Sequence, residues 1–218
     1  MIKLSKRLLT VASFIKDNSY VCDVGCDHAY LPIYLCENKK NIKVIASDIN
    51  LNPLKIAKDN IKKYNLEKVI KVEQRDGINN LDKFVDTVVI SGMGGILISD
   101  IIGNKDNLIN VKTLILSPNN EWKKVRRTLN KIKYHIIREE IVIENKKLYI
   151  IMEATKSSKK NNIMFGKLKK NDLNVIYYYS DLLTKNTYIL KKIPKKYIIK
   201  RAKLKIENWK IKKYLNSK

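Results

Sequence analysis

Apolar and polar positions along residues 1–155 follow two periods in turn, one typical of helices and one typical of buried strands. Leu4, Leu8 and Val11 share a helical spacing and predict an amphipathic helix at the start of the chain. Short apolar runs then predict strands over residues 20–24, 42–46, 69–72, 86–90 and 111–116. Helical spacing predicts helices between them, over residues 32–38, 52–64, 95–102 and 121–131.

The order of these elements predicts an α/β fold. Strands that alternate with helices imply right-handed crossovers, which build a doubly wound, Rossmann-like sheet. Two further apolar runs, residues 134–143 and 147–154, flank a turn at Asn145. They predict an antiparallel pair that closes the sheet.

The chain after residue 155 has a different pattern. A polar stretch over residues 156–162 predicts a linker, so we expect one domain over 1–155 and a second over 156–218. Pro194 separates two helical patterns, and the pair predicts an antiparallel helical hairpin of coiled-coil type. The expected contact positions are Leu173, Ile176, Ser180, Leu183, Thr187 and Leu190, then Tyr197, Leu204, Ile211 and Leu215.

Charge divides the chain at the same place. The 218 residues carry 45 basic and 21 acidic side chains, a net charge of +24, and residues 156–218 contribute 19 of the basic and 3 of the acidic ones. Biased coding explains the preference for lysine over arginine, but it does not explain the surplus over acids. We therefore expect a polyanionic partner, with nucleic acid as the first candidate.

Cysteines and apolar runs exclude several classes of protein. Cys22, Cys26 and Cys36 are an odd number, which argues against a disulfide framework and favours the cytoplasm. Few potential ligands lie near them, so we expect no metal. No apolar run approaches the roughly 18 residues that cross a membrane, and polar residues interrupt the one near the start, which reads as a helix rather than a secretion signal.

The glycines indicate where a ligand binds. Of seven glycines, five follow predicted strands: Gly25, Gly77, Gly92, Gly94 and Gly95. In a doubly wound sheet, ligands bind beyond the carboxyl ends of the strands, where the backbone turns sharply. We interpret these loops as the walls of a pocket, with ordinary turns as the alternative.

The first loop favours a cationic ligand. A dinucleotide site has three glycines, but only Gly25 is present here, and Asp27 would repel a phosphate. S-adenosylmethionine fits, because it has no phosphate and carries an ammonium and a sulfonium. Asp23 or Asp27 could hold the ammonium, directly or through water, although Asp27 could instead be a turn or cap carboxylate.

Later strand ends complete the predicted cofactor site. Asp48 could accept hydrogen bonds from both ribose hydroxyls, and Asp76 could accept one from the adenine amino group while Gly77 lets the ring lie close. The expected cofactor-binding residues are Asp23, Gly25, Asp27, Asp48, Ile49, Asp76, Gly77, Gly92 and Met93.

Four runs carry a resemblance to a known family. They are residues 4–8 (LSKRL), 23–32 (DVGCDHAYLP), 92–95 (GMGG) and 118–119 (PN). Together they resemble the bacterial tRNA adenine-22 N1-methyltransferase family (TrmK), over residues 1–155 in sequence and in the type of tail. The chain departs at Cys26, Asp48 and Ser117, where serine, glutamate and glutamine are common.

The resemblance implies a class I S-adenosylmethionine-dependent methyltransferase that modifies N1 of an adenosine in the D-loop region of tRNA. Adenine N1 has a free lone pair, so we expect no obligatory general base and assign positioning roles to Asp27, His28, Gly94 and Asn119. The expected tRNA contacts are Arg7, Tyr30, Lys123, Lys124, Arg126 and Arg127, together with the basic tail.

Other functions remain open on the sequence. A methyltransferase for another RNA would carry the same cofactor residues. A non-catalytic RNA-binding adaptor is disfavoured because Asp23, Gly25, Asp48 and Asp76 are all intact, and a nicotinamide dehydrogenase is disfavoured by the missing glycines. The sequence identifies no protein partner.

Overall fold

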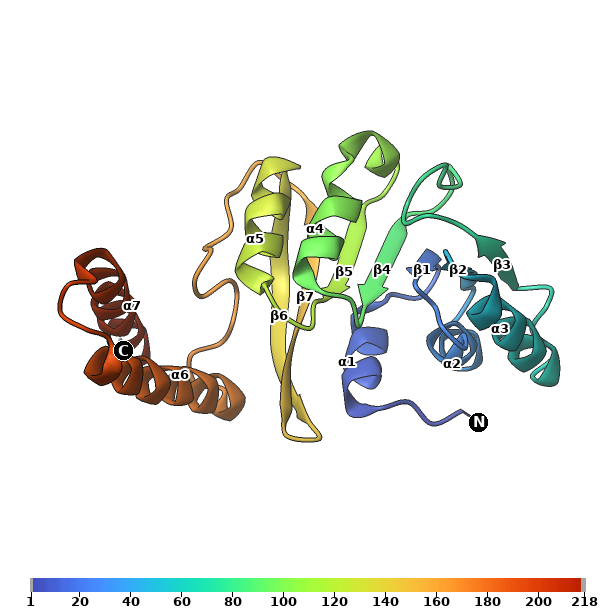
Figure 1. Ribbon diagram of the computed structural model, residues 1–218. Coiled ribbons are helices and arrows are strands. Elements are labelled where there is room, and N and C mark those ends of the chain that lie inside the picture. The colour runs from blue at the N-terminus through green and yellow to red at the C-terminus, as the bar shows by residue number, and fades with distance from the viewer. Residues whose placement is uncertain (1, 217–218) are drawn as a thin grey trace. The chain divides into compact units, whose positions relative to one another are not determined.

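Seven strands form one mixed sheet in the order β3-β2-β1-β4-β5-β7-β6 (Figure 1). The computed structural model describes residues 2–216. Strands β1 to β5 pair in parallel, whereas β7 pairs antiparallel with both β5 and β6. The strands are β1 Tyr20–Val24, β2 Lys43–Asp48, β3 Ile70–Gln74, β4 Thr87–Ser91, β5 Thr113–Ser117, β6 Tyr134–Glu144 and β7 Lys147–Lys156. Because the order reverses between β1 and β4, the topological switch point lies between them.

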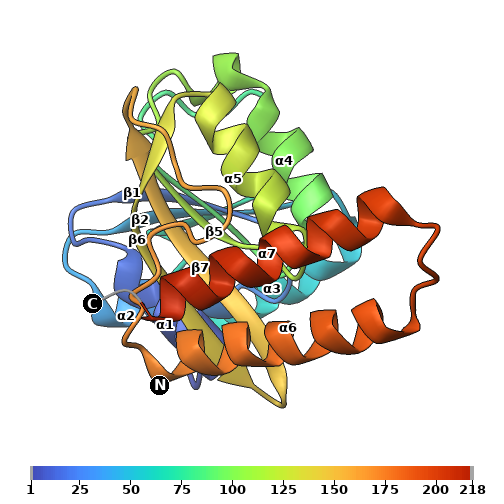
Figure 2. The ribbon, with the colours of Figure 1, turned by 90° about the vertical axis from the view of Figure 1, so that its left-hand side faces the viewer.

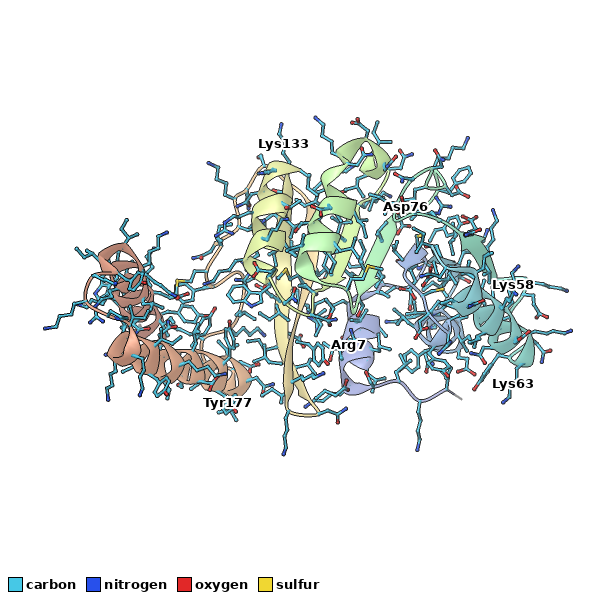
Figure 3. The ribbon with its side chains drawn as sticks, in the orientation of Figure 1. Arg7, Lys58, Lys63, Asp76, Lys133 and Tyr177 are labelled. Carbon is cyan, nitrogen blue, oxygen red and sulfur yellow. The ribbon has the colours of Figure 1, made fainter. Side chains whose placement is uncertain are left out.

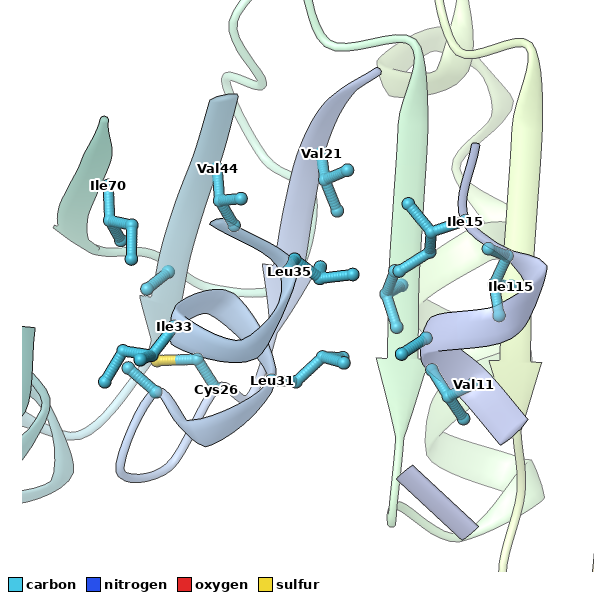
Figure 4. Packing of buried hydrophobic residues seen from close by; sticks show 14 of the residues in the cluster. Val11, Ile15, Val21, Cys26, Leu31, Ile33, Leu35, Val44, Ile70 and Ile115 are labelled. Carbon is cyan, nitrogen blue, oxygen red and sulfur yellow. The ribbon is translucent and has the colours of Figure 1, made fainter. Parts of the chain in front are cut away.

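Helices cover both faces of the sheet. Those packed in the core cluster of Figure 4 are α1 Lys6–Phe14, α2 Tyr30–Asn38 and α3 Leu51–Lys63. Helices α4 Gly95–Gly103 and α5 Trp122–Lys131 lie side by side on the other face (Figures 1 and 2), with a short 3-10 helix, η1 Lys105–Leu108, after α4.

The core explains why this order of elements folds. Strands β1, β2, β4 and β5 are buried over nearly their whole length, as expected for parallel strands covered on both sides. Val11 of α1 and Ile33 of α2 pack over them without exposed surface (Figure 4). Each such side chain contributes roughly 1.5–3 kcal/mol when fully buried.

The sequence-based strands and helices of the first part are confirmed, with ends that differ by a few residues. The hairpin turn is confirmed as well, because Asn145 and Lys146 both have positive φ, +49° and +61°. Two such residues make the turn that suits a two-residue β-hairpin. Helix η1 was not expected, since four residues carry too little periodicity to be recognised.

The expected linker over residues 156–162 is wrong. The chain divides into compact units between Lys167 and Leu168 instead. Asn161 is 7% exposed, and its side chain accepts a hydrogen bond from Ile136 N (2.7 Å) and donates one to Tyr134 O (2.8 Å). This amide bonds backbone groups at a register shift in β6. A polar composition therefore resembles a linker here although it serves the fold.

Arg126 binds the residues that directly follow this segment, so its expected role as a tRNA contact is wrong. Its side chain has no exposed surface. It donates to Glu139 Oε1 from Nε (3.0 Å) and Nη2 (2.6 Å), and to the carbonyls of Ile163 and Met164 (3.1 and 2.9 Å). A charge enclosed this way cannot reach a phosphate on another molecule.

The second unit, residues 168–216 as described, is a pair of helices. Helix α6 spans Leu173–Lys192 and α7 spans Ile198–Asn216. Asp172 caps α6, because its Oδ1 accepts from the backbone N–H of Asn174 at 2.8 Å. The hairpin is confirmed. Within residues 2–216, no helix is both long and apolar enough to cross a membrane.

The contact face expected for α6 is wrong. Leu173 is 81% exposed, whereas Val175, Tyr179 and Asn186 are buried. Asn186 donates to Asn208 Oδ1 of α7 at 2.9 Å. Apolar residues occupy several sides of α6, and a buried asparagine interrupts the true stripe, so the pattern did not identify it.

Candidate functional site

The loops after β1 and β4 meet at the switch point. Gly25 has φ +74°, and the N–H groups of Gly25 and Cys26 both donate to Ser47 O, at 2.8 and 2.9 Å. A Cβ at Gly25 would collide with Cε of Met93, from the loop after β4. The positive φ favours glycine at this position, and any side chain would also force the end of Met93 to move.

Two carboxylates lie near this junction. Asp23, in β1, is 5% exposed, and within residues 2–216 no hydrogen bond or ion pair joins its carboxylate to another residue. Burial, and then the negative charge of Asp48, raise the pKa of Asp23 to about 7. Asp48, at the end of β2, accepts from the backbone N–H of Asn50 at 2.9 Å. A cationic ligand would relieve this repulsion, so the pair fits the ammonium and sulfonium of S-adenosylmethionine.

The loop after β3 presents the next predicted residues. Asp76 (Figure 3) is exposed, and Gly77 has φ +57°. A Cβ at Gly77 would lie 3.2 Å from Ile101 Cγ2, so the glycine gives the loop its close approach to α4. Next to Asp48, the side chain of Ile49 is 56% exposed. Asp76 and Ile49 are thus exposed to solvent at the carboxyl edge of the sheet and do not line a closed pocket.

The loop before α2 is held in an unusual conformation. Asp27 and Ala29 both lie in the left-handed region, with φ +51° and +58°. Asn60 of α3 donates to His28 O at 2.9 Å and ties this loop to the fold. His28 lies edge-on to Tyr30, with ring centroids 5.6 Å apart, and Tyr30 is 44% exposed. Such backbone strain costs about 1–3 kcal/mol per residue and clusters at functional sites.

Two asparagines after β5 hold the glycine loop 92–95. Asn119 donates from Nδ2 to Gly92 O at 2.5 Å, and its backbone N–H donates to Met93 O at 2.9 Å. Asn120 Oδ1 accepts from Gly95 N at 3.1 Å. Asn120 was not predicted, although a second asparagine directly after the Pro-Asn pair was a usable signal.

The expected tRNA contacts fall in different places. Arg7 lies beside the end of β4 (Figure 3), where Nη1 donates to Ser91 Oγ at 3.0 Å. Lys123 and Lys124 are half-buried on α5, and Lys124 Nζ lies 3.7 Å from Asp100 Oδ1. Arg127 is exposed. Without Arg126, the expected basic face of α5 is narrower than the sequence suggested.

A hollow of about 460 Å³ opens at the opposite edge of the sheet. Its lining includes Ser19, Thr87 and Thr113, which lie at the beginnings of β1, β4 and β5. None of the predicted site residues lines it. The chemistry-bearing loops therefore lie at the carboxyl edge, away from this hollow.

Comparison with known proteins identifies the family of the chain. The model of a family described as a methyltransferase domain matches residues 4–152. The tRNA (adenine(22)-N(1))-methyltransferase of Bacillus subtilis is 41% identical over 155 residues, which cover 70% of this chain and 65% of that enzyme. The chain thus aligns with slightly less than two thirds of that relative's length.

Solved structures extend the similarity to the tail. A protein of the NADB-Rossmann superfamily from Streptococcus agalactiae is 32% identical, with a TM-score of 0.90, over 99% of this chain and 98% of that chain. TrmK of M. capricolum, in complex with S-adenosylhomocysteine, is 31% identical, with a TM-score of 0.87, over 98% of both chains. This chain has the class I methyltransferase fold and belongs to the bacterial tRNA (adenine(22)-N(1))-methyltransferase family, TrmK.

Proposed function

We propose that this protein transfers a methyl group from S-adenosylmethionine to N1 of adenine 22 in tRNA. The observation that carries the proposal is the pair of carboxylates, Asp23 and Asp48, that no cation neutralises within residues 2–216, next to an open glycine loop. Family membership supplies the identity of the acceptor, because the relative in B. subtilis, which is also called TrmK, carries that activity in its name.

Residues at the carboxyl edge of the sheet each bind a different part of the cofactor. Asp23 and Asp27 hold the ammonium, Asp48 and Ile49 hold the ribose, and the loop at residues 76–77 holds the adenine. Gly92 and Met93 lie against the methionine part. When bound, the cofactor supplies an electrophilic methyl group on a sulfonium.

Catalysis requires placement of the target base more than proton transfer. The N1 lone pair forms the new bond to the methyl carbon while the carbon–sulfur electrons remain on sulfur, which becomes a neutral thioether. No proton moves, so a general base is unnecessary. Asn119 and the flat surface at Gly94 position the adenine, and Asp27 and His28 line its approach.

Binding of tRNA depends on a wider basic surface. Arg7, Tyr30, Lys123, Lys124 and Arg127 serve the nucleotides near the site. The tail, with its excess of lysines, holds the phosphates of the folded tRNA body. These contacts suit an enzyme of the cytoplasm that works on free tRNA.

Mass mapping of modified nucleosides tests the proposal. The purified protein is incubated with S-adenosylmethionine and with tRNA transcripts that have adenine or guanine at position 22. We expect N1-methyladenosine only in the first transcript. Modification at another position would favour a different RNA target. Cofactor binding with no product on any tRNA would favour a non-catalytic adaptor.

A further inference from the structure

Arg7 is held at the entrance to the glycine loop by three strands of the sheet. Its Nη1 donates to Ser91 Oγ at the end of β4, at 3.0 Å, and its backbone N–H donates to Glu144 Oε1 at the end of β6, at 3.2 Å. Its Cζ lies 5.1 Å from the centroid of the Tyr149 ring in β7. A cation over an aromatic face in this range is attracted by the ring quadrupole.

Tyr149 reaches the site because β7 runs against the parallel strands. Leu116 of β5 pairs with Met152, so residue 149 lies past the carboxyl end of β5. Strand alternation puts Tyr149 on the same face as Ile151, which packs in the core cluster with Val11 of α1. The sequence analysis indicated neither Tyr149 nor Ser91. Tyr149 lies near the start of the second hairpin strand, and a hairpin pattern does not mark such a position as part of a site.

The guanidinium keeps unused hydrogen-bond donors. Arginine has five N–H groups, and within residues 2–216 the side chain of Arg7 makes one hydrogen bond, to Ser91. A Cβ at Gly92 would lie 3.2 Å from Nη1 and 3.6 Å from Nη2, so the absence of a side chain there leaves the guanidinium beside the glycine loop. The remaining donors are available to a ligand that enters at this loop.

The chemistry of the reaction decides which part of a nucleotide they bind. Methylation at N1 gives the adenine ring a positive charge, and a guanidinium bonded to that ring would oppose this charge as it develops. A phosphate has the opposite charge, and its oxygens match the planar fork of arginine. Arg7 therefore suits the backbone next to the target base rather than the base itself.

We infer that Arg7 binds the phosphate adjoining the target adenosine, and that Tyr149 is a positioning residue that holds the guanidinium in the plane required. The inference rests on the proposed function and adds to it the contact that fixes how far the base enters. Tyr149 touches no substrate in this arrangement; it acts through Arg7.

Binding of tRNA over a series of salt concentrations tests the phosphate contact without requiring turnover. Each phosphate contact contributes about one unit to the slope of log affinity against log salt. We expect Arg7→Gln to lower this slope by about one unit and to weaken tRNA binding about tenfold or more. Arg7→Lys keeps the charge and should keep most of the slope. An unchanged slope in Arg7→Gln would overturn the inference.

Single-turnover methylation at saturating tRNA tests the role of Tyr149. We expect Tyr149→Leu to slow the reaction about tenfold, with cofactor affinity and the urea midpoint unchanged, because only the orientation of Arg7 is lost. Tyr149→Phe should restore most of the rate, since the ring face rather than the hydroxyl contacts Arg7. Equal rates in the two variants, or a parallel loss of cofactor affinity in Tyr149→Leu, would refute a positioning role.

These readouts separate the inference from the proposed function. A protein that binds tRNA with an Arg7-dependent salt slope, yet methylates no adenine 22, would support the phosphate contact and refute the proposed activity. If the protein methylates adenine 22 but Arg7→Gln does not change the salt dependence of tRNA binding, the proposed activity is supported and the phosphate contact is refuted.

Discussion

Asp23 combines burial with an unsatisfied charge, and both the fold and the cofactor respond to its protonation. Its folded pKa of about 7 lies well above the ordinary value for an aspartate, about 3.9. Protonated Asp23 therefore favours the folded apo-protein at low pH, and this contribution is lost as the pH rises from about 4 through about 7. A bound cation favours the ionised form instead.

We predict that affinity for S-adenosylmethionine rises between pH 6 and pH 7.5. One pH unit below the pKa leaves about a tenth of Asp23 ionised, so binding at pH 6 should be about tenfold weaker than its maximum. Titration calorimetry across this range measures the change. Asp23→Asn should remove the dependence while weakening binding throughout. A profile that is the same in the wild type and the variant would show that Asp23 does not face the cation.

The contrast between Arg126 and Arg127 shows what a sequence pattern can and cannot give for single residues. Both are basic positions on one helix with polar neighbours, and the sequence placed both on an exposed face. One turns inward because Glu139, on a strand 13 residues later, lies across from it. No local period encodes that pairing.

The two arginines also form a matched test of stability. We predict that Arg126→Met lowers the free energy of unfolding by about 3–5 kcal/mol, because Glu139 is left as a buried charge without its partner. Arg127→Met should change it by less than about 0.5 kcal/mol. Urea unfolding of both variants gives the comparison. Similar midpoints would mean that solvent reaches Glu139.

At the scale of elements, the glycine loop after β4 combines a fixed backbone with open space. Gly94 has φ −66°, and among residues 2–216 a Cβ there would meet only Asn120 Oδ1, at 3.5 Å. A Cβ at Gly95 would collide with the backbone of Asn120 and Glu121. The two neighbouring glycines thus serve different purposes. Gly95 allows close packing of the backbone, whereas Gly94 leaves open space for a ligand.

We predict that Gly94→Val abolishes methylation and leaves cofactor affinity unchanged, because the backbone accepts a side chain there but the purine loses its space. Gly95→Ala should instead distort the loop and lower stability. Methylation assays, calorimetry and thermal unfolding separate the two effects. Turnover by Gly94→Val would place the base elsewhere, and lost cofactor binding would place Gly94 itself against the cofactor rather than the purine.

Elements were predictable where one period dominates and less so where several compete. Strands β1, β2, β4 and β5 are short apolar runs bounded by turn residues, and their positions followed from the sequence. Helix α6 has apolar residues around much of its circumference, so the choice of Leu173 over Val175 for its buried side was arbitrary. The contacts of Asn186 depend on α7 and cannot be inferred from α6 alone.

At the scale of the whole molecule, the division after Lys167 determines where the tail can be removed without disturbing the first unit. A truncation at residue 159 would remove the segment that Asn161 and Arg126 bind into the first unit. Removal of residues 168–218 leaves those contacts intact. The sequence places the boundary at residue 156, whereas the compact units meet after Lys167, because composition does not report hydrogen bonding.

We predict that removal of residues 168–218 leaves the affinity for S-adenosylmethionine unchanged, since every proposed cofactor contact lies in the first unit. The affinity for tRNA should fall and depend less steeply on salt, because half of the net positive charge, +12 of +24, is removed. Filter binding of both proteins across a salt series measures this. Equal affinities and slopes would show that the tail only keeps the protein soluble.

The clasp formed by Arg126, Glu139 and residues 163–167 has a consequence for how this family can vary. Because these contacts close the first unit before Leu168, we expect its stability to depend little on the sequence that follows. The methyltransferase-domain model stops at residue 152, whereas the solved relatives superpose along 98% of the chain or more. Exchanging the tail at Leu168 for that of a relative should give a folded chimera, and its tRNA preference should follow the donor of the tail.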